Sequence, residues 1–433
     1  MNRLQRFLLH PIVLMVLACW GSYLIWLLTS ASFLEAEGMI KADPATGALV
    51  ALMSSGCFVA GCFIQRVFFR KSQSDLTVEV VPLRRDCMMG LVATIGFLAI
   101  LVAMLVANGG AGAIAESIAG KLKGATVPGV TTLVHIGTAL PPLGIGMAIL
   151  LWRSGHRRWS RSFLLIGLAS LMVGGLRAYL TAERISLLVP VLASIIVVAA
   201  MLRRNVVRRI LTISIVFPLF LALYFIASES IRSFQVKSAG GKLEENVWEY
   251  TSARLLLYYV TAVNGGIAEY RLLLDKGLAT PVFDNTLNPL SQVLGIMGVQ
   301  MSIEGKPSPG RTKALIEEQY RLAEFTNTWG FSTPWSEGHL VGASFWVLWG
   351  AISTWLYRRM CGSDSPLDIA PYAIVAVALF DSSRVLVLGA VHCLVPLVYL
   401  LFLRNRNGRR LRNTGSAARV SAPEEASWRE SNE

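Results

Sequence analysis

The stretch ISLLVPVLASIIVVAAML, residues 185–202, carries no charged side chain, and Arg203 and Arg204 follow it directly. A run of this kind, close to ~20 residues, is long enough to cross the hydrocarbon layer of a bilayer as a helix. Arginines directly after such a run favour the cytoplasmic side, because Lys and Arg are enriched in cytoplasmic connections. The stretch therefore predicts a transmembrane helix whose C-terminal end lies in the cytoplasm.

The composition of the whole chain agrees with this prediction. Of its 433 residues, 54% are hydrophobic and only 15% are charged, and the mean hydropathy is +0.55. A water-soluble protein of this length would not show that balance. The net charge of +13 would suggest a nucleic-acid partner in a soluble protein. Here the Lys and Arg residues cluster between apolar runs, so we expect them to set the membrane topology and expect no nucleic-acid partner.

Other apolar runs alternate with basic or polar connections along the chain. We predict an all-α, polytopic membrane protein with about ten transmembrane helices and both termini in the cytoplasm, since a helix pairs all its backbone groups internally. The predicted spans are Pro11–Thr29, Gly47–Phe69, Met88–Ala107, Thr131–Trp152, Ser162–Gly175, Ile185–Leu202, Ile210–Ala227, Leu340–Leu356, Ile369–Ser383 and Val385–Leu403. The first run exceeds the ~7 to 15 apolar residues of a cleaved signal peptide, so we interpret it as an anchor.

The predicted organisation has four parts. Residues 1–227 hold helices one to seven, 228–339 form a large periplasmic loop, 340–403 hold helices eight to ten, and 404–433 form a cytoplasmic tail. The tail has too few apolar residues to offset its ordering entropy, so we expect it to be disordered. The loop is far longer than the ~2 to 8 residues that neighbouring helices need, and such loops commonly carry function.

One segment of the long loop shows helical periodicity. Apolar residues recur in steps of three and four between Arg254 and Asp275, with an interruption at Gly265 and Gly266. The apolar part is too short to span a bilayer, so we predict an interfacial helix. Such a helix either guides a lipid-linked substrate sideways into a cavity or only anchors the loop.

Several arginines depart from the cytoplasmic bias and fall on the predicted outer side, namely Arg177, Arg184, Arg232, Arg254, Arg271 and Arg384. Arginine stays charged and offers a planar fork of donors that fits phosphate oxygens. Several of them around one cavity would bind a pyrophosphate, whereas the alternative is that each reaches singly to lipid headgroups. Arg177 and Arg184 close the two ends of one short predicted outer turn, so we expect both to face the same aqueous mouth.

The end of the long loop carries a second group of polar and aromatic residues. Asn327 and Trp329 precede Glu337 and His339, directly before the eighth span. Aromatic side chains suit stacking on sugar rings, and either a carboxylate or the imidazole of His339 suits proton transfer near neutral pH. The alternative is that Trp329 and Trp335 belong to an aromatic belt at the membrane surface, where a Glu or a His is ordinary.

The sequence offers no pattern for a metal or cofactor. The six cysteines lie in apolar runs or at their basic ends and match no zinc spacing; they are Cys19, Cys57, Cys62, Cys87, Cys361 and Cys393. We interpret them as small apolar packing residues. No Asp-x-Asp pair occurs on the predicted outer side. We therefore expect neither a metal ion nor a cofactor.

These features, in this order, resemble the Wzy-type oligosaccharide repeat-unit polymerases of bacterial surface polysaccharide synthesis, which are related in fold to the O-antigen ligases. The resemblance rests on Thr181-Ala-Glu-Arg184-Ile-Ser-Leu-Leu, Ser230-Ile-Arg232-Ser-Phe, Asn327-Thr-Trp, Glu337-Gly-His-Leu-Val-Gly342 and Tyr357-Arg358-Arg359. The sequence departs from the family pattern where Glu337 stands for an Asp, Gly338 for a Phe and His339 for a Gly.

The resemblance implies a metal-independent glycosyltransferase of the GT-C type in the bacterial inner membrane, with its active site facing the periplasm. It would join undecaprenyl-pyrophosphate-linked repeat units, with Arg184, Arg232, Arg177, Arg254 and Arg384 on the pyrophosphate, Asn327 and Trp329 on the sugars, and Glu337 or His339 as the base. Expected partners are the lipid-linked oligosaccharide, membrane lipid, and a chain-length regulator and flippase. Alternatives are an O-antigen ligase with the same architecture, a polysaccharide-lipid transporter or flippase, and a structural membrane protein.

Overall fold

The computed structural model describes residues 3–36, 39–68, 78–118, 134–181, 185–202, 247–277, 286 and 328–414. All regular structure in these ranges is helical. The helices are α1 (Arg3–Leu8), α2 (Pro11–Leu28), α3 (Ala31–Ala36), α4 (Pro44–Phe68), α5 (Val80–Ile118), η1 (His135–Ala139), α7 (Leu140–Arg153), α8 (Arg157–Thr181), α9 (Ile185–Met201), α12 (Val247–Lys276), α15 (Thr333–Ser336), α16 (His339–Gly362), α17 (Pro366–Asp381) and α18 (Val391–Thr414).

Six of these helical stretches are long and apolar enough to cross a membrane. They are Pro11–Leu28, Pro44–Phe68, Val80–Met104, His135–Arg153, Arg157–Leu180 and His339–Gly362. The apolar helix α9 is slightly shorter, and α17 and α18 occupy the region of the last two predicted spans. The predicted span Ile210–Ala227 lies outside the described residues. Over the described ranges the structure thus confirms the all-helical fold, and its long apolar helices fit a membrane protein.

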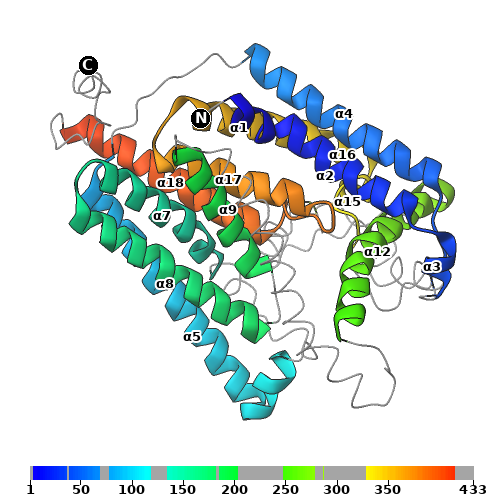
Figure 1. Ribbon diagram of the computed structural model, residues 1–433, viewed down its shortest axis with the longest axis horizontal. Coiled ribbons are helices and arrows are strands. Elements are labelled where there is room, and N and C mark those ends of the chain that lie inside the picture. Colours follow the sequence, from blue (N-terminus) through cyan, green and yellow to red (C-terminus); the bar gives the residue numbers. More distant parts are fainter. Residues whose placement is uncertain are drawn as a thin grey trace.

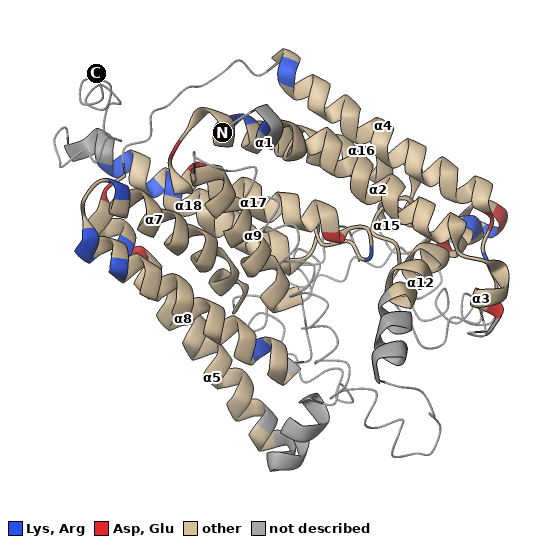
Figure 2. Ribbon diagram, viewed as in Figure 1, with Lys and Arg blue, Asp and Glu red and all other residues tan. Residues whose placement is uncertain are grey.

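The helices share one strongly basic end. Figure 2 shows Lys and Arg concentrated where α4 ends and where α7 passes into α8. Contacts between helices agree with this placement: Arg358 donates to Gln65, and Arg84 donates to Ser162. We call this side the basic end and the other side, where α12 and α15 lie, the α12 end. The consecutive helices α16, α17 and α18 run alternately between the two ends, as expected of membrane spans.

Two predicted boundaries are too narrow. Helix α8 continues to Thr181, so Arg177 lies within a helix and does not begin a turn. Helix α5 continues to Ile118, past the end of its predicted span at Ala107. In both places the helix continues because its backbone hydrogen bonds do not depend on apolar side chains. The length of the apolar run therefore predicts the part that crosses the membrane and not the end of the helix.

The last hairpin also differs from its prediction. Helix α18 begins at Val391 instead of Val385 and continues to Thr414, past the predicted start of the disordered tail at Arg404. Ion pairs explain the extension: Arg404 Nε lies 2.6 Å from Asp368 Oδ1 of α17, and Arg406 and Arg410 both pair with Asp86 of α5. Each of these pairs holds a further turn of α18 against its neighbours.

Helix α17 occupies the centre of the molecule. It contacts α2, α7, α9, α16 and α18, and almost every one of its residues is buried. A helix that is apolar all round belongs in an interior. In Figure 1, α17 lies between the group formed by α2, α4 and α16 and the group formed by α5, α7 and α8.

Helices α4 and α16 approach each other through glycines. Gly61 of α4 faces the carbonyl oxygen of Val347, and Gly350 of α16 faces the carbonyl oxygen of Phe58. The Cys62 thiol donates to the Gly350 carbonyl at 3.4 Å. Small residues let membrane helices pack at short backbone distances, where dispersion contacts are strongest.

Replacing Gly61 by alanine should separate this pair of helices. A methyl group at position 61 would overlap the backbone of α16, which cannot move aside as a flexible side chain can. We expect a loss of at least ~1–3 kcal/mol in unfolding free energy, as for an overpacked core. Gly56→Ala, on the same helix but with open space around it, should be neutral or stabilising by up to ~1 kcal/mol. Thermal unfolding of the two purified variants in detergent measures the difference, and equal unfolding temperatures would contradict this packing.

Candidate functional site

Helix α12 lies against the ends of α2 and α4 and is held there by a buried amide. The side chain of Asn264 accepts hydrogen bonds from Trp26 Nε1 at 3.1 Å and from the Ala42 amide at 2.8 Å, and donates to the Ile40 carbonyl at 2.8 Å. A buried amide with its donors and acceptors used in this way is strongly specific for one arrangement. Asn264 therefore fixes α12 to α2 and to the segment that leads into α4.

The periodic segment predicted as an interfacial helix is part of a longer helix with different surroundings. Helix α12 is continuous from Val247 to Lys276, so Gly265 and Gly266 do not interrupt it. Residues 260–270 are buried on every face. Gly266 is needed because a side chain there would overlap Ser332 and the backbone of Trp329. This part of α12 is an internal wall of the protein and is not an amphipathic surface helix.

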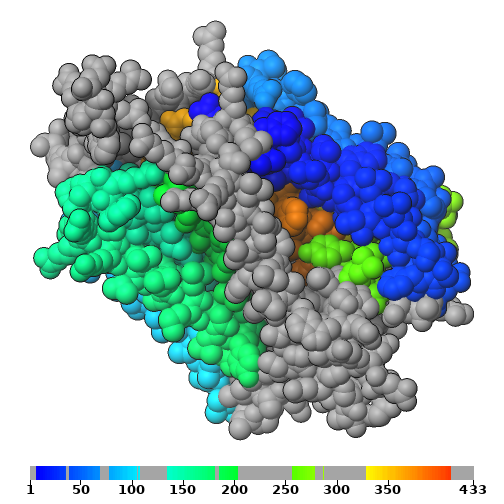
Figure 3. Space-filling view, viewed as in Figure 1, coloured from blue at the N-terminus to red at the C-terminus, as the bar shows by residue number. Residues whose placement is uncertain are grey.

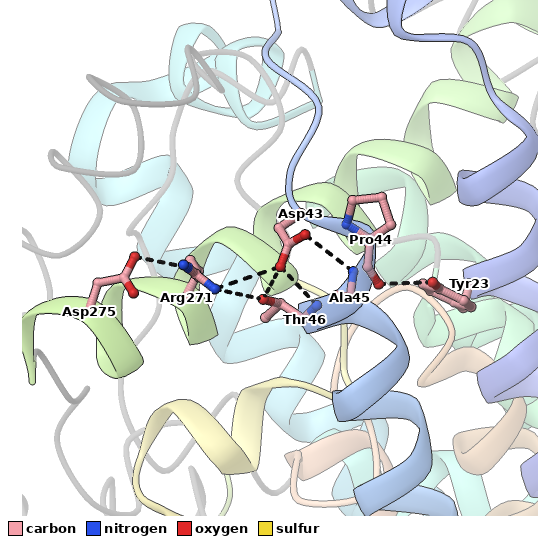
Figure 4. Close-up of polar contacts among 7 residues, drawn as sticks. All are labelled: Tyr23, Asp43, Pro44, Ala45, Thr46, Arg271 and Asp275. Carbon is pink, nitrogen blue, oxygen red and sulfur yellow. Dashed lines mark hydrogen bonds and ion pairs between the residues drawn. The ribbon is translucent and has the colours of Figure 1, made fainter.

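An ion-pair network holds the C-terminal part of α12 against the start of α4 (Figure 4). Asp43 caps α4, accepting from the Thr46 amide at 3.0 Å and from the Thr46 hydroxyl at 2.6 Å. Those hydrogen bonds lower the pKa of Asp43. Arg271 lies 2.9 Å from Asp275 and 3.7 Å from Asp43. Since all three charges are used within this network, we assign Arg271 a structural role.

The segment from Thr328 to Gly338 packs between α12 and the membrane helices. Both of its indoles are buried: Trp329 Nε1 donates to Ser22 at 3.1 Å, and Trp335 Nε1 donates to Ser54 at 2.7 Å. The Trp329 amide donates to the Ala262 carbonyl of α12. Neither indole is exposed as a residue of an aromatic belt would be, and the Trp329 ring, predicted to stack on a sugar, has no exposed face in this structure.

Glu337 ends this segment and faces inward. Its carboxylate accepts from the Thr286 amide at 3.0 Å and from the Thr286 hydroxyl at 2.6 Å, one bond on each oxygen. Thr286 in turn lies against Gly389 in the turn after α17. Glu337, predicted as a base, therefore has both oxygens occupied by Thr286 in this structure and connects three separate parts of the chain.

His339 faces the opposite way from Glu337. Gly338, between them, has φ +137°, a backbone angle that side chains disfavour. His339 is exposed at the start of α16, and its Nδ1 lies 3.3 Å from the Tyr270 hydroxyl. The sequence places these two predicted bases within three positions, yet the structure puts one inside and the other on the surface.

A second carboxylate, Glu269 of α12, lies beside Glu337 inside the protein. Its side chain is buried, and its Oε2 has no hydrogen-bond partner among the described residues. Burial raises the pKa of Glu269 to about 7; hydrogen bonding with Ser336 opposes the shift and the charge of Glu337 adds to it. A pKa near neutrality suits a group that accepts or gives a proton. Sequence analysis did not single out Glu269.

Arg384 lies in the turn between α17 and α18, as predicted. Its guanidinium is 3.6 Å from Asp381 and lies over the Tyr258 ring of α12, 5.2 Å from the ring centre. The turn is packed against the Thr328–Gly338 segment, because Gly330 faces the Ser382 carbonyl and the backbone at Val385. Arg384 is thus brought to α12 and to the segment that carries Glu337.

Arg177 lies in a different group. Its two terminal nitrogens are 3.1 and 3.0 Å from the two ring nitrogens of His135, and the His392 ring centre is 4.1 Å from that of His135. A neutral imidazole has one acceptor nitrogen, so at most one of these contacts is an ordinary hydrogen bond. Arg177 is only 5% exposed, so it is built into the interior and does not stand at an open turn.

The other predicted site residues are not compared with the structure. Arg184, Arg232 and Asn327 lie outside the described residues, and Arg254 falls within α12 at a position whose side chain is also outside them. Within the described part, no group of three or more His, Cys, Asp or Glu residues is placed to hold a metal ion.

Comparison of the chain with protein-family models, with curated proteins and with solved structures gave no match.

Removing the Thr286 hydroxyl tests the contact with Glu337. Thr286→Val keeps the side-chain shape but deletes the donor to a carboxylate, so we expect a loss of about 1.5–3 kcal/mol in unfolding free energy. Thr286→Ser keeps the hydroxyl and serves as the control. Chemical unfolding in detergent, followed by tryptophan fluorescence, compares the two. If the Val variant were as stable as the Ser variant, the hydrogen bond would carry no net stability.

Proposed function

We propose that the protein is a metal-independent membrane glycosyltransferase that joins lipid-pyrophosphate-linked oligosaccharide repeat units into a polysaccharide. The observation that carries the proposal is that three chain segments come together at the α12 end. Three segments far apart in sequence meet there: α12, the segment ending at Glu337, and the turn with Arg384. In Figure 3, the colours of α12 and the α17 region are visible in a hollow beside the N-terminal helices.

The charges of this end suit the proposed chemistry. The reaction breaks a bond between a sugar carbon and a pyrophosphate oxygen, so negative charge grows on a group that is already a good leaving group. A fixed guanidinium stabilises such charge without having to reorganise. Arg384 is held by Asp381 and Tyr258, and we propose that it acts with Arg184, Arg232 and Arg254. A carboxylate or imidazole at the same end would take the proton of the acceptor hydroxyl.

Orientation follows from the distribution of basic residues. The basic end carries Arg66, Arg153, Arg157 and Arg358, at the ends of α4, α7, α8 and α16, and the positive-inside rule assigns such an end to the cytoplasm. The α12 end would then face the periplasm of a bacterial inner membrane, where lipid-linked repeat units are polymerised by the family that the sequence resembles. Arg177 does not share the group around Arg384 in the described contacts, so we propose that it acts with His135 as a separate structural or anion-binding group.

The proposal is tested by turnover of a defined lipid-pyrophosphate oligosaccharide by the purified protein. Wild type should release lipid pyrophosphate and make products of increasing length. Arg384→Ala should lower the rate about 10²–10³-fold, as loss of one charge-stabilising donor does, and Arg384→Lys should lower it less. Arg271→Ala removes an arginine of the same end that pairs with Asp43 and Asp275, and should retain turnover.

The fate of the substrate separates the alternatives. Cells lacking the protein should accumulate single lipid-linked repeat units if it is a polymerase and long lipid-linked chains if it is a ligase. Movement of intact lipid-linked oligosaccharide across vesicles without release of pyrophosphate would indicate a transporter and would overturn the proposal. So would an Arg384→Ala variant that is inserted correctly and makes full-length polymer at the wild-type rate.

A further inference from the structure

Two carboxylates lie beside each other in the interior of the α12 end, and their surroundings differ. Glu337 is 2% exposed and Glu269 is 6% exposed. Both oxygens of Glu337 accept hydrogen bonds from Thr286. Among the described residues, Oε2 of Glu269 has no such partner. The pair therefore contains one carboxylate with a hydrogen bond on each oxygen and one with an oxygen that accepts no hydrogen bond from the described residues.

Leaving a buried carboxylate oxygen without a donor is costly, so it requires an explanation. An unsatisfied buried polar atom costs about 1–3 kcal/mol, and more when it is charged. Two like charges at one buried place make the cost larger, and in such pairs one carboxyl commonly keeps its proton near neutral pH. Catalytic sites are where proteins tolerate this arrangement.

Of the described charged and titratable groups near Glu269, Glu337 is the one whose charge affects the protonation of Glu269. Among the described residues packed around this part of α12, Glu337 is the charged side chain that raises the pKa of Glu269. Arg271, two positions further along, is engaged by Asp43 and Asp275. Tyr270 is directed to His339 on the surface. Hydroxyl groups of Ser336 and Thr328 complete the surroundings of Glu269.

We propose that Glu269 is the proton acceptor for the sugar hydroxyl that attacks, and that Glu337 is a positioning residue. This inference rests on the proposed glycosyl transfer. The acceptor hydroxyl gives its proton to Glu269 as its oxygen forms the new bond to the sugar carbon. The bond from that carbon to the pyrophosphate oxygen breaks, and its electron pair leaves with the lipid pyrophosphate. No oxidant, reductant or metal is needed for this balance.

The other candidate bases fit this role less well. Both oxygens of Glu337 accept hydrogen bonds from Thr286, which stabilise its charged form and so make it a weaker base. His339 stands on the surface beyond Gly338, with Tyr270 as its neighbour. Glu269 already has an oxygen without a donor and hydroxyl groups beside it that resemble the sugar hydroxyls it would receive.

The first test compares variants that change one carboxylate of the same helix. Glu269→Gln should reduce turnover of the lipid-pyrophosphate oligosaccharide about 10²–10⁴-fold, the usual contribution of a general base. Glu269→Asp keeps the carboxylate and should retain a measurable rate with the same pH dependence. Asp275→Asn removes an exposed carboxylate from α12 and should turn over normally. A Glu269→Gln rate within threefold of wild type would overturn the inference.

The second test uses pH, since a base must be deprotonated to act. The wild-type kcat/KM should rise with pH through a midpoint near 7, the value to which burial raises the pKa of Glu269. Glu337→Gln removes the neighbouring negative charge and should shift this midpoint to lower pH, whereas a merely structural role for Glu337 would change the rate without moving the midpoint. An unchanged midpoint in Glu337→Gln would overturn the assignment of Glu337.

A measurement without substrate separates this inference from the proposed function. Because the folded state holds the proton of Glu269 more tightly than the unfolded state, wild-type stability should fall as pH rises from about 5 to 8. Glu269→Gln has no such proton and should lose that part of the pH dependence of the unfolding temperature. Wild type that does not turn over the substrate, but differs from Glu269→Gln in the pH dependence of its unfolding temperature, would contradict the glycosyltransferase proposal and leave the raised pKa of Glu269 supported. If wild type turns over and Glu269→Gln shows neither effect, the role of Glu269 fails alone.

Discussion

The carboxamide of Asn264 accepts two hydrogen bonds and donates one, and its partners come from α2 and from the segment before α4. Trp26 and Ala42 are buried, so their N–H groups depend on Asn264 in place of water. The contact therefore decides where α12 sits relative to the membrane helices. The Thr328–Gly338 segment then packs on Gly266, and the turn with Arg384 packs on Gly330. The position of the Thr328–Gly338 segment thus depends on α12, and the position of the turn with Arg384 depends on that segment.

Six of the predicted spans are found as long apolar helices, because the main determinant of such a helix is local. An apolar run that ends in arginines has one stable solution in a bilayer, and six such runs are helices of the right length. Helix ends were predicted less well. Helix α18 extends to Thr414 since Arg404 and Arg406 find carboxylates on α17 and α5, and a distant partner cannot be recognised from the spacing of apolar residues.

The candidate site was predicted in part for the same reason. Arg384 and Glu337 were chosen for their charge and predicted side of the membrane, and the structure places both beside α12, near Tyr258 and Glu269 respectively. Trp329 was chosen for its aromatic ring, but its burial depends on Ser22, which is far away in the sequence. Glu269 was missed because helical periodicity reports apolar positions. A carboxylate between Ile267 and Leu272, shortly after Gly265 and Gly266, was the available signal that this helix is buried on more than one face.

The two ends of the molecule are held by ion pairs of different kinds. Arg404 and Asp368 at the basic end are shielded from solvent, whereas Arg271 and its partners at the α12 end are about half exposed. Dissolved ions weaken exposed pairs much more than shielded ones. Raising the ionic strength should then weaken the pairing of Arg271 with Asp43 and Asp275, while the hydrogen bonds of buried Asn264 keep α12 in place and the Arg404–Asp368 pair keeps α18 against α17.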